Sequence, residues 1–469
     1  MKMEMEREPF KLSLFEIICL LFPLLFAPVA WLSDSRLVGA SYGYASMPFE
    51  LFGFFASLAV AGVCYLKLKR GYEPLRVLVF FALSSITLVL MVEHISPKWD
   101  YMCYERAARA LISGEGVYAS SLSHCYFYPP IYAQILAGAF RLLSAAGVAD
   151  NKAWHIVYLF HYASQFYFVL IAWMMLSRMA TVCGMDVAKA ELVAALILAI
   201  NTAFVRNLVF HQLNFTTLAL ALGAIWLASA APAASGLLLA TSIGLKLFPL
   251  FLLIPLLYAR RYRAVVWSLV WGAAILAVSF ALNGQVWFDY LGHTLPPDKP
   301  FYRNFSPVAI ISNILGFVRP DARAHMDEVA RAYGAMWFVA SVAILLLLKP
   351  TRRRPDGIDE WGLYSFALAI APLGSPQQWS HQMIMALPLT IWLLLTSERP
   401  YGILVPAALT FGFPVFDVFP FSYHRLAGIL WLLALGYARL RKGRNRPRTD
   451  TEPKRPVADA KSDAPRDPF

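Results

Sequence analysis

The sequence predicts an all-α polytopic membrane protein, from its composition, the length of its apolar runs and the placement of its basic residues. Of the 469 residues, 59% are hydrophobic and 15% are charged, whereas a soluble domain averages about 45–50% apolar and about 25% charged residues. The mean hydropathy is +0.56. The apolar residues come in runs of about 15–25, a length that crosses a bilayer as a helix. This composition excludes an ordinary soluble, fibrous or disordered protein.

The apolar runs divide into full spans and one interrupted segment. The candidate spans are about 12–32, 49–67, 75–95, 156–178, 188–204, 210–231, 264–282, 334–349, 361–375, 382–397, 401–419 and 424–439. The stretch 236–259 has cytoplasmic flanks on both sides, and Gly244, Lys246 and Pro249 interrupt its centre. We expect a hairpin of two short helices broken near Lys246, because irregular backbone at membrane depth needs protein or a water-filled cavity around it. The total is about 12–14 transmembrane segments.

The basic residues lie in clusters directly beside apolar runs. These clusters are 67–76, 260–263, 349–354 and 439–448. With a cytoplasmic N-terminus every cluster falls on the cytoplasmic side, as the positive-inside rule requires. The net charge of +12 is therefore a topology signal, and we expect no nucleic-acid partner. Two long, nearly charge-balanced loops, 96–153 and 283–333, then face outward.

Cys103 and Cys125 both lie in the first of these outer loops. If the loop faces an oxidising compartment they can form a disulfide, and otherwise they are two independent thiols. The spacing of the five cysteines matches no zinc site.

Asp100 lies at the outer membrane boundary, directly before a helical pattern that covers about 102–111. Its position allows two roles. Asp is a favoured N-cap residue, and a carboxylate at the boundary can also accept a proton from a substrate hydroxyl. Glu93, His94 and Glu105 are alternative proton acceptors near the same face.

Four groups of residues follow one another along about 75–400. The first is Asp100-Tyr101, Tyr104, Ala107-Ala108, Gly114, Gly116-Val117-Tyr118 and Tyr128-Pro129-Pro130. The second is Gln212-Leu213-Asn214, Gly236, Gly244, Lys246, Pro249 and Arg260-Arg261. The third is Asn304-Phe305-Ser306, and the fourth is Ser375-Pro376 with Trp379-Ser380-His381. Together and in this order, they resemble the motifs of glycosyltransferase family 87. In three places the chain departs from the family pattern: His211 stands for Gly, Phe305 for Gln, and Gln382 for a second His.

This family comprises polyprenyl-phosphate-mannose-dependent mannosyltransferases of the GT-C superfamily. The resemblance implies a GT-C-like transmembrane bundle over 75–439, with juxtamembrane helices in a catalytic outer loop at 96–153 and a second outer loop at 283–333. The segment 1–74 then holds two additional transmembrane helices. The segment 440–469, rich in Pro and charge, is expected to be a disordered cytoplasmic tail.

The resemblance makes Asp100 the general base of an inverting sugar transfer, a mechanism that needs no second, nucleophilic carboxylate. His381 becomes the candidate that stabilises the departing phosphate. Lys246 either contacts phosphate or snorkels to a headgroup, and Arg206 and Arg303 are further candidate phosphate ligands.

The remaining candidates are neutral polar residues. Gln212, Asn214, Asn304 and Ser306 either bind sugar hydroxyls or form interhelical hydrogen bonds. Tyr128 either stacks on a sugar ring or belongs to an interfacial aromatic belt.

The expected activity is transfer of one sugar, mannose by resemblance, from a polyprenyl-phosphate donor to an outward-facing glycolipid or polysaccharide acceptor. We expect a cell-membrane enzyme with no metal or other cofactor, an extracytoplasmic active site and both termini cytoplasmic. The alternatives are transfer of another sugar such as arabinofuranose, or a non-enzymatic transporter of lipids or small molecules. A transporter should hold its key ionisable groups at the bilayer midplane, where Lys246 is the one candidate.

Overall fold

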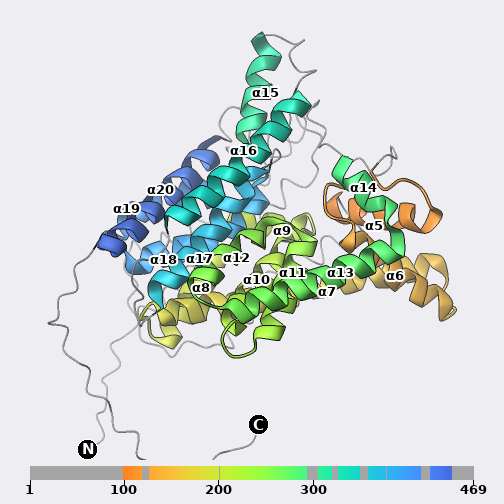
Figure 1. Cartoon of the computed structure of the whole chain (residues 1–469), viewed down its shortest axis with the longest axis horizontal. Coiled ribbons are helices and arrows are strands. Elements are labelled where there is room, and N and C mark those ends of the chain that lie inside the picture. Colours follow the sequence, from red (N-terminus) through yellow and green to blue (C-terminus); the bar gives the residue numbers. More distant parts are fainter. Residues whose placement is uncertain are drawn as a thin grey trace, which may run out of the picture.

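The structure is a computed structural model in which every element of the described residues is a helix (Figure 1). It describes residues 99–118, 126–199, 201–292, 305–318, 326–348, 357–375, 378–412 and 423–445. The three predicted spans before residue 99 and nearly all of the predicted tail lie outside these ranges.

The described helices follow one another along the chain, and several are joined by short connections. The α-helices are α5 (Trp99–Ser113), α6 (Ile131–Ala145), α7 (Asp150–Val182), α8 (Val187–Ala199), α9 (Thr202–Val209), α10 (Asn214–Leu227), α11 (Pro232–Leu245), α12 (Leu253–Tyr258), α13 (Tyr262–Asn283), α14 (Gln285–Gly292), α15 (Pro307–Val318), α16 (Met326–Leu347), α17 (Ile358–Ile370), α18 (Leu387–Thr396), α19 (Tyr401–Phe411) and α20 (His424–Asn445). The 3₁₀ turns are η1 (Phe248–Leu252), η3 (Ala371–Gly374) and η4 (Ser380–Ala386).

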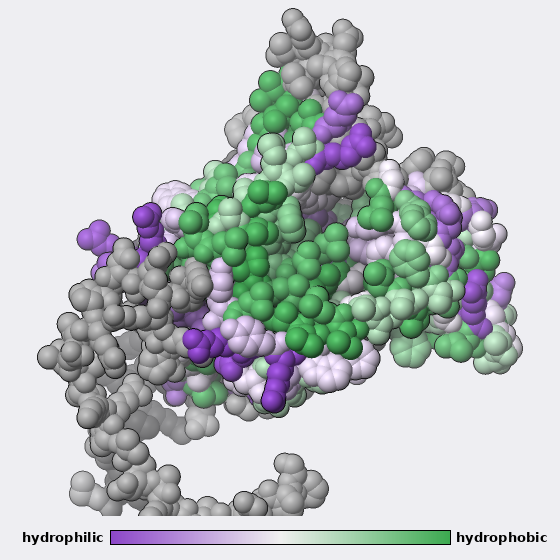
Figure 2. All heavy atoms as spheres, viewed as in Figure 1, coloured by the Kyte–Doolittle hydropathy of each residue, from purple (hydrophilic) through white to green (hydrophobic). Residues whose placement is uncertain are grey.

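Two of the described helices are long and apolar enough to cross a membrane, Tyr262–Asn283 and Glu328–Leu347. Large apolar side chains of α13 are exposed, among them Leu269 at 59% and Val278 at 62%. Figure 2 shows hydrophobic side chains across the middle of one face and hydrophilic ones toward its margins. A continuous exposed apolar surface of this kind suits contact with lipid. The predicted number of spans beyond these two helices stays a prediction.

The predicted break near Lys246 is present. Helix α11 ends at Leu245, and Lys246 has an extended backbone before η1 begins at Phe248. A continued α-helix would set the ring of Pro249 against the carbonyl of Leu245. Helix α11 packs closely on α13, because a Cβ on Gly236 would lie 2.5 Å from the backbone of Trp267. This contact fixes the helix whose end presents Lys246.

The predicted span 188–204 is divided between α8, which ends at Ala199, and α9, which begins at Thr202, and two further predicted spans are divided as well. The segment 361–375 forms α17 and then η3, and 382–397 begins within η4 and becomes α-helical only at Leu387. Pro372 and Pro388 lie at the start of the following element in each case, the position in a helix where proline is tolerated.

Helices α5, α6 and α14 gather at one end of the molecule, apart from α19 and α20 at the other (Figure 1). Buried tyrosines form the core beneath α5 and α6, among them Tyr101, Tyr104, Tyr126 and Tyr132. The loop between α9 and α10 carries His211 and Gln212. Helices α9 and α10 both contact η4. This loop therefore lies where motifs distant in the sequence converge.

Candidate functional site

A hydrogen-bonded chain links Asp100, Gln212 and Lys246. Asp100 lies in the first turn of α5, and its Oδ2 accepts a hydrogen bond from Nε2 of Gln212. Lys246 donates through Nζ to Oε1 of Gln212 at 2.9 Å. The two ends of one amide thus connect a carboxylate and an ammonium from segments far apart in the sequence. Asp100 is inside the helix rather than at its N-cap, and its carboxylate bonds across the fold.

The amide oxygen of Gln212 and the ammonium of Lys246 have further partners. Tyr104 and Tyr128 donate their hydroxyls to Gln212 Oε1 at 3.3 and 3.2 Å. Lys246 donates to Asn214 Oδ1 at 2.6 Å, and its Nζ lies 4.5 Å from the ring centre of Tyr128. An ammonium has three donors, and the amide oxygens of Gln212 and Asn214 take two of them. The third is available for a ligand.

The Asp100 carboxyl has a pKa suited to accepting a proton near neutral pH. Removal of the carboxylate from water raises its pKa from 3.8 to about 6, while the hydrogen bond from Gln212 and the charge of Lys246 oppose the rise. A general base works best when its pKa lies close to the working pH.

The backbone at His211 aims Gln212 toward Asp100. His211 has a φ of 55°, in the left-handed region that costs a residue with a Cβ about 1–2 kcal/mol. Its carbonyl accepts a hydrogen bond from Nε2 of His161 at 3.1 Å, and Nδ1 of His161 accepts one from the Tyr132 hydroxyl. The family pattern has glycine at this position, and the backbone conformation explains why glycine suits it.

We expect His211→Gly to be more stable than His211→Ala by about 1 kcal/mol. Both substitutions remove the buried imidazole, but only alanine keeps the Cβ that the left-handed backbone disfavours. Thermal unfolding of the two purified variants in the same detergent measures the difference. Equal midpoints, or a higher midpoint for the alanine variant, would contradict the backbone argument.

His381, predicted to stabilise the departing phosphate, contacts the side-chain nitrogen of Asn214, whereas Lys246 contacts the side-chain oxygen. The carbonyl of His381 accepts from Nδ2 of Asn207 at 2.7 Å and from Nδ2 of Asn214 at 3.3 Å. Its buried ring stacks on Trp379 with centroids 6.4 Å apart and planes 9° apart. Arg206, also buried, donates to the hydroxyl of Ser380. His381 and Arg206 therefore hold the turn η4 against α9, and their predicted contact with phosphate stays a prediction.

The third and fourth sequence motifs meet in the structure. The backbone N–H of Phe305 donates to the carbonyl of Gln378 at 3.2 Å. The hydroxyl of Ser306, predicted to bind sugar, accepts from the backbone N–H of Ala309 at 3.0 Å at the start of α15. Arg303 and Asn304 lie outside the described residues. Cys103 is disulfide-bonded, and Cys125 also lies outside the described residues.

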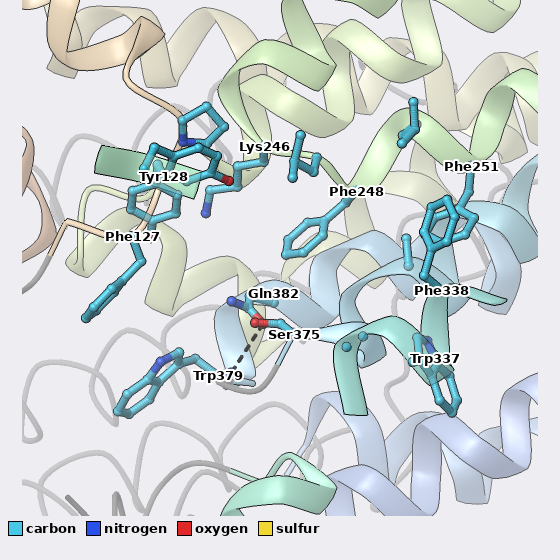
Figure 3. Close-up of a pocket in the computed structure, with 17 residues that line it drawn as sticks. Phe127, Tyr128, Lys246, Phe248, Phe251, Trp337, Phe338, Ser375, Trp379 and Gln382 are labelled. Atoms are coloured by element: carbon cyan, nitrogen blue, oxygen red, sulfur yellow. Dashed lines mark hydrogen bonds between the residues drawn. The ribbon is translucent and has the colours of Figure 1, made fainter. Parts of the chain in front are cut away.

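A cavity of about 350 Å³ opens beside Lys246 (Figure 3). Lys246 and Tyr128 lie together at one end, and Phe251, Trp337 and Phe338 lie at the other. The other lining residues are Phe127, Pro129, Leu247, Phe248, Leu250, Tyr290, Gly334, Ala371, Gly374, Ser375, Trp379 and Gln382. Asp100 and His381 do not line the cavity: Asp100 connects to it through Gln212 and Lys246, and His381 through Trp379. A cavity that is charged at one end and apolar along its length fits an amphiphile.

Several residues of the site were not among the predicted ones. Tyr104 belongs to the first motif, but its hydroxyl contact with Gln212 depends on the pairing of α5 with the α9–α10 loop. Asn207 is a buried amide in an apolar helix, a signal that could have marked it. Phe248, Trp337 and Phe338 line the cavity. In the sequence they lie in apolar stretches that resemble any other, so no local signal marks them.

The residues that the structure describes contain no group of three His, Cys, Asp or Glu side chains arranged for a metal ion. The expectation that the reaction needs no cofactor stays a prediction.

The fold and the site together define a helical protein with two helices long and apolar enough to cross a membrane, and with a cavity whose buried ammonium is linked through Gln212 to a half-buried carboxylate. The family model of glycosyltransferase family 87 matches residues 126–376. Because the match covers more than half of the chain, the protein belongs to this family and is a membrane glycosyltransferase. No curated protein and no solved structure was found to match the chain. Gln212 and Lys246 lie within the matched stretch, whereas Asp100 and His381 lie outside it.

Proposed function

We propose that the protein is an inverting GT-C glycosyltransferase that moves one sugar, mannose by family resemblance, from a polyprenyl-phosphate donor to a glycolipid or glycan acceptor. The observation that carries the proposal is the cavity with Lys246 at one end and aromatic side chains along the rest. A polyprenyl phosphate likewise has one charged end, the phosphate, and a long apolar chain. The phosphate would take the remaining donor of Lys246, and the prenyl chain would lie along Phe248, Phe251 and Phe338.

Asp100 acts as the general base in this reaction. The acceptor O–H gives its proton to the carboxylate, and the oxygen attacks the anomeric carbon from the face opposite the phosphate. The bond between that carbon and the phosphate oxygen breaks, and polyprenyl phosphate leaves with the electron pair. Lys246 stabilises the negative charge that develops on the leaving oxygen. One carboxylate suffices, because no covalent sugar–enzyme intermediate forms.

The proposed site faces the extracytoplasmic side of the cell membrane, and both termini are cytoplasmic. The disulfide at Cys103 supports this orientation, since disulfides persist in oxidising compartments and Cys103 lies three residues beyond Asp100 on α5.

The test is a transfer assay with the purified full chain, a panel of radiolabelled polyprenyl-phosphate sugars and a panel of alkyl glycosides and membrane glycolipids as acceptors. We expect a glycosylated product with polyprenyl-phosphate mannose and inversion at the anomeric carbon. A product formed only with the arabinofuranosyl donor would mean that the transferred sugar is arabinofuranose and not mannose. Movement of labelled lipid across vesicles without any transfer product would identify a transporter and overturn the proposal.

We expect the rate of sugar transfer to rise with pH through about pH 6. The pKa of Asp100 is raised to about 6, so the carboxyl is protonated and inactive as a base below that pH and ionised above it. A phosphodiester donor stays ionised throughout this range and does not mask the change. The check is kcat/KM as a function of pH, with retention on size-exclusion chromatography at each pH. A profile that is flat between pH 5 and pH 7 would contradict the assignment of Asp100 as the base.

A further inference from the structure

Gln212 was predicted either to bind sugar or to form interhelical hydrogen bonds, and its side-chain amide is engaged within the protein at both ends. Nε2 donates to Asp100 Oδ2, and Oε1 accepts from Lys246, Tyr104 and Tyr128. The side chain is 1% exposed. Asp100 can only accept when ionised, and Lys246 can only donate. These two partners therefore fix which end of the amide faces which residue.

We propose that Gln212 is a positioning residue that holds the Asp100 carboxylate in its ionised form and orients it, and that Lys246 keeps the amide in the required orientation. The inference rests on the proposed function, because it concerns the base of that reaction. It assigns Gln212 no contact with the sugar.

Gln212 donates a hydrogen bond to the base, and Asn214 does not. Asn214 accepts from the same ammonium, but its Nδ2 donates to Asn207 and to the carbonyl of His381 rather than to a carboxylate. The amide of Gln212 joins Lys246, which lines the cavity, to the base. A phosphate bound to Lys246 would interact with the same ammonium that donates to the Gln212 side-chain carbonyl and polarises it. Donor binding and the state of the base are thus coupled through one side chain.

A change in pH dependence can be attributed to Asp100. Among the described residues, the titratable groups that face it are Tyr104 of α5, Tyr128 of the segment before α6, and Lys246 at the end of α11. Burial raises the pKa of both tyrosines above the ordinary value, so their hydroxyls stay protonated around pH 6. Lys246 is retained in every variant below. The acidic limb of the rate profile therefore reports on Asp100.

The experiment compares pH–rate profiles of the wild-type chain with those of Gln212→Met and Gln212→Glu, using the polyprenyl-phosphate sugar that the wild type turns over. Methionine keeps the length of the side chain but donates no hydrogen bond. We expect the midpoint of the acidic limb to move to higher pH by about one unit, the scale of one hydrogen bond to a charged group. Gln212→Glu sets a second carboxylate against Asp100, and like charges raise the pKa further. We expect its midpoint to move at least as far.

The matched control is Gln134→Met. Gln134 is buried in α6 and donates to the carbonyl of Ser279 at 2.9 Å, so the same chemical change is made away from Asp100. Its midpoint should equal that of the wild type. A Gln212→Met variant that loses rate without moving the midpoint would make Gln212 a structural residue and overturn the inference, as would loss of folding in both Gln212 variants.

These outcomes are separate from failure of the proposed function. If the wild-type chain transfers no sugar, the proposed function fails, and the inference fails with it. If the wild type is active and an Asp100 variant is inactive, but Gln212→Met keeps the wild-type profile, only the inference fails.

Discussion

Asp100→Asn should lower kcat of sugar transfer by about 10²–10⁴-fold, the contribution typical of a positioned general base. Asparagine has nearly the shape of aspartate, and its Oδ1 can still accept the hydrogen bond that Gln212 donates to Asp100. The variant should therefore fold and keep its donor site. Because an amide cannot take the acceptor proton, the attack on the anomeric carbon loses its base. The KM for the donor should change much less than kcat, since Lys246 and the cavity are unaltered.

The control for this substitution is Glu105→Gln on the same helix. Glu105 pairs with Arg109 at 2.6 Å near the surface, and an exposed pair of this kind contributes little to stability. We expect it to keep wild-type kcat. Loss of activity in Glu105→Gln together with full activity in Asp100→Asn would move the base from Asp100 to Glu105. The measurement is initial rate in the transfer assay, with protein matched by thermal unfolding midpoint.

The helices of this fold follow from local sequence, and the sites of their interruption follow from single residues. The apolar run at 264–282 predicts α13 to within a few residues of its observed bounds, Tyr262–Asn283, because an apolar run of this length has few other stable structures in lipid. Pro249 predicts the break at which Lys246 lies. Pro372 and Pro388 divide segments that hydropathy alone joins, and their effect was missed because a proline in the first turn leaves hydropathy unchanged.

The candidate site was predictable as a set of residue types but not as a set of contacts. Lys246 stands out as a charge within an apolar run, and Asp100 as a carboxylate close to the end of one. Which group bonds to which depends on the pairing of α5 with the α9–α10 loop, a tertiary contact that no local pattern encodes. For this reason the sequence leaves open whether Gln212 binds sugar or forms hydrogen bonds between helices, and the structure shows its amide bonded to Asp100 and Lys246. The same two roles are open for Ser306, whose hydroxyl accepts from the backbone N–H of Ala309 in α15.

Lys246→Met should lower kcat/KM for the donor by about 10²–10³-fold, the loss typical when a preorganised donor to a developing negative charge is removed. Methionine has about the length of lysine and suits the apolar wall of Leu247 and Phe248. Without the ammonium, the phosphate enters a cavity whose other described lining residues are uncharged, so both donor binding and departure of polyprenyl phosphate should suffer. Lys246→Arg keeps the charge but changes its geometry, and we expect it to recover part of the activity.

Stability and chemistry can be separated for this residue. Removing Lys246 leaves Asn214 Oδ1 without the donor that lies 2.6 Å away, which costs about 1–3 kcal/mol, but it also removes a buried charge. The two effects oppose each other, so the unfolding midpoint should change far less than the rate. Lys189→Met, at an exposed position of α8, is the matched control and should have wild-type activity. Binding of radiolabelled polyprenyl phosphate to each variant gives the decisive comparison. If Lys246→Met binds it with wild-type affinity, the ammonium is not the phosphate ligand, and the cavity must hold the donor in another orientation.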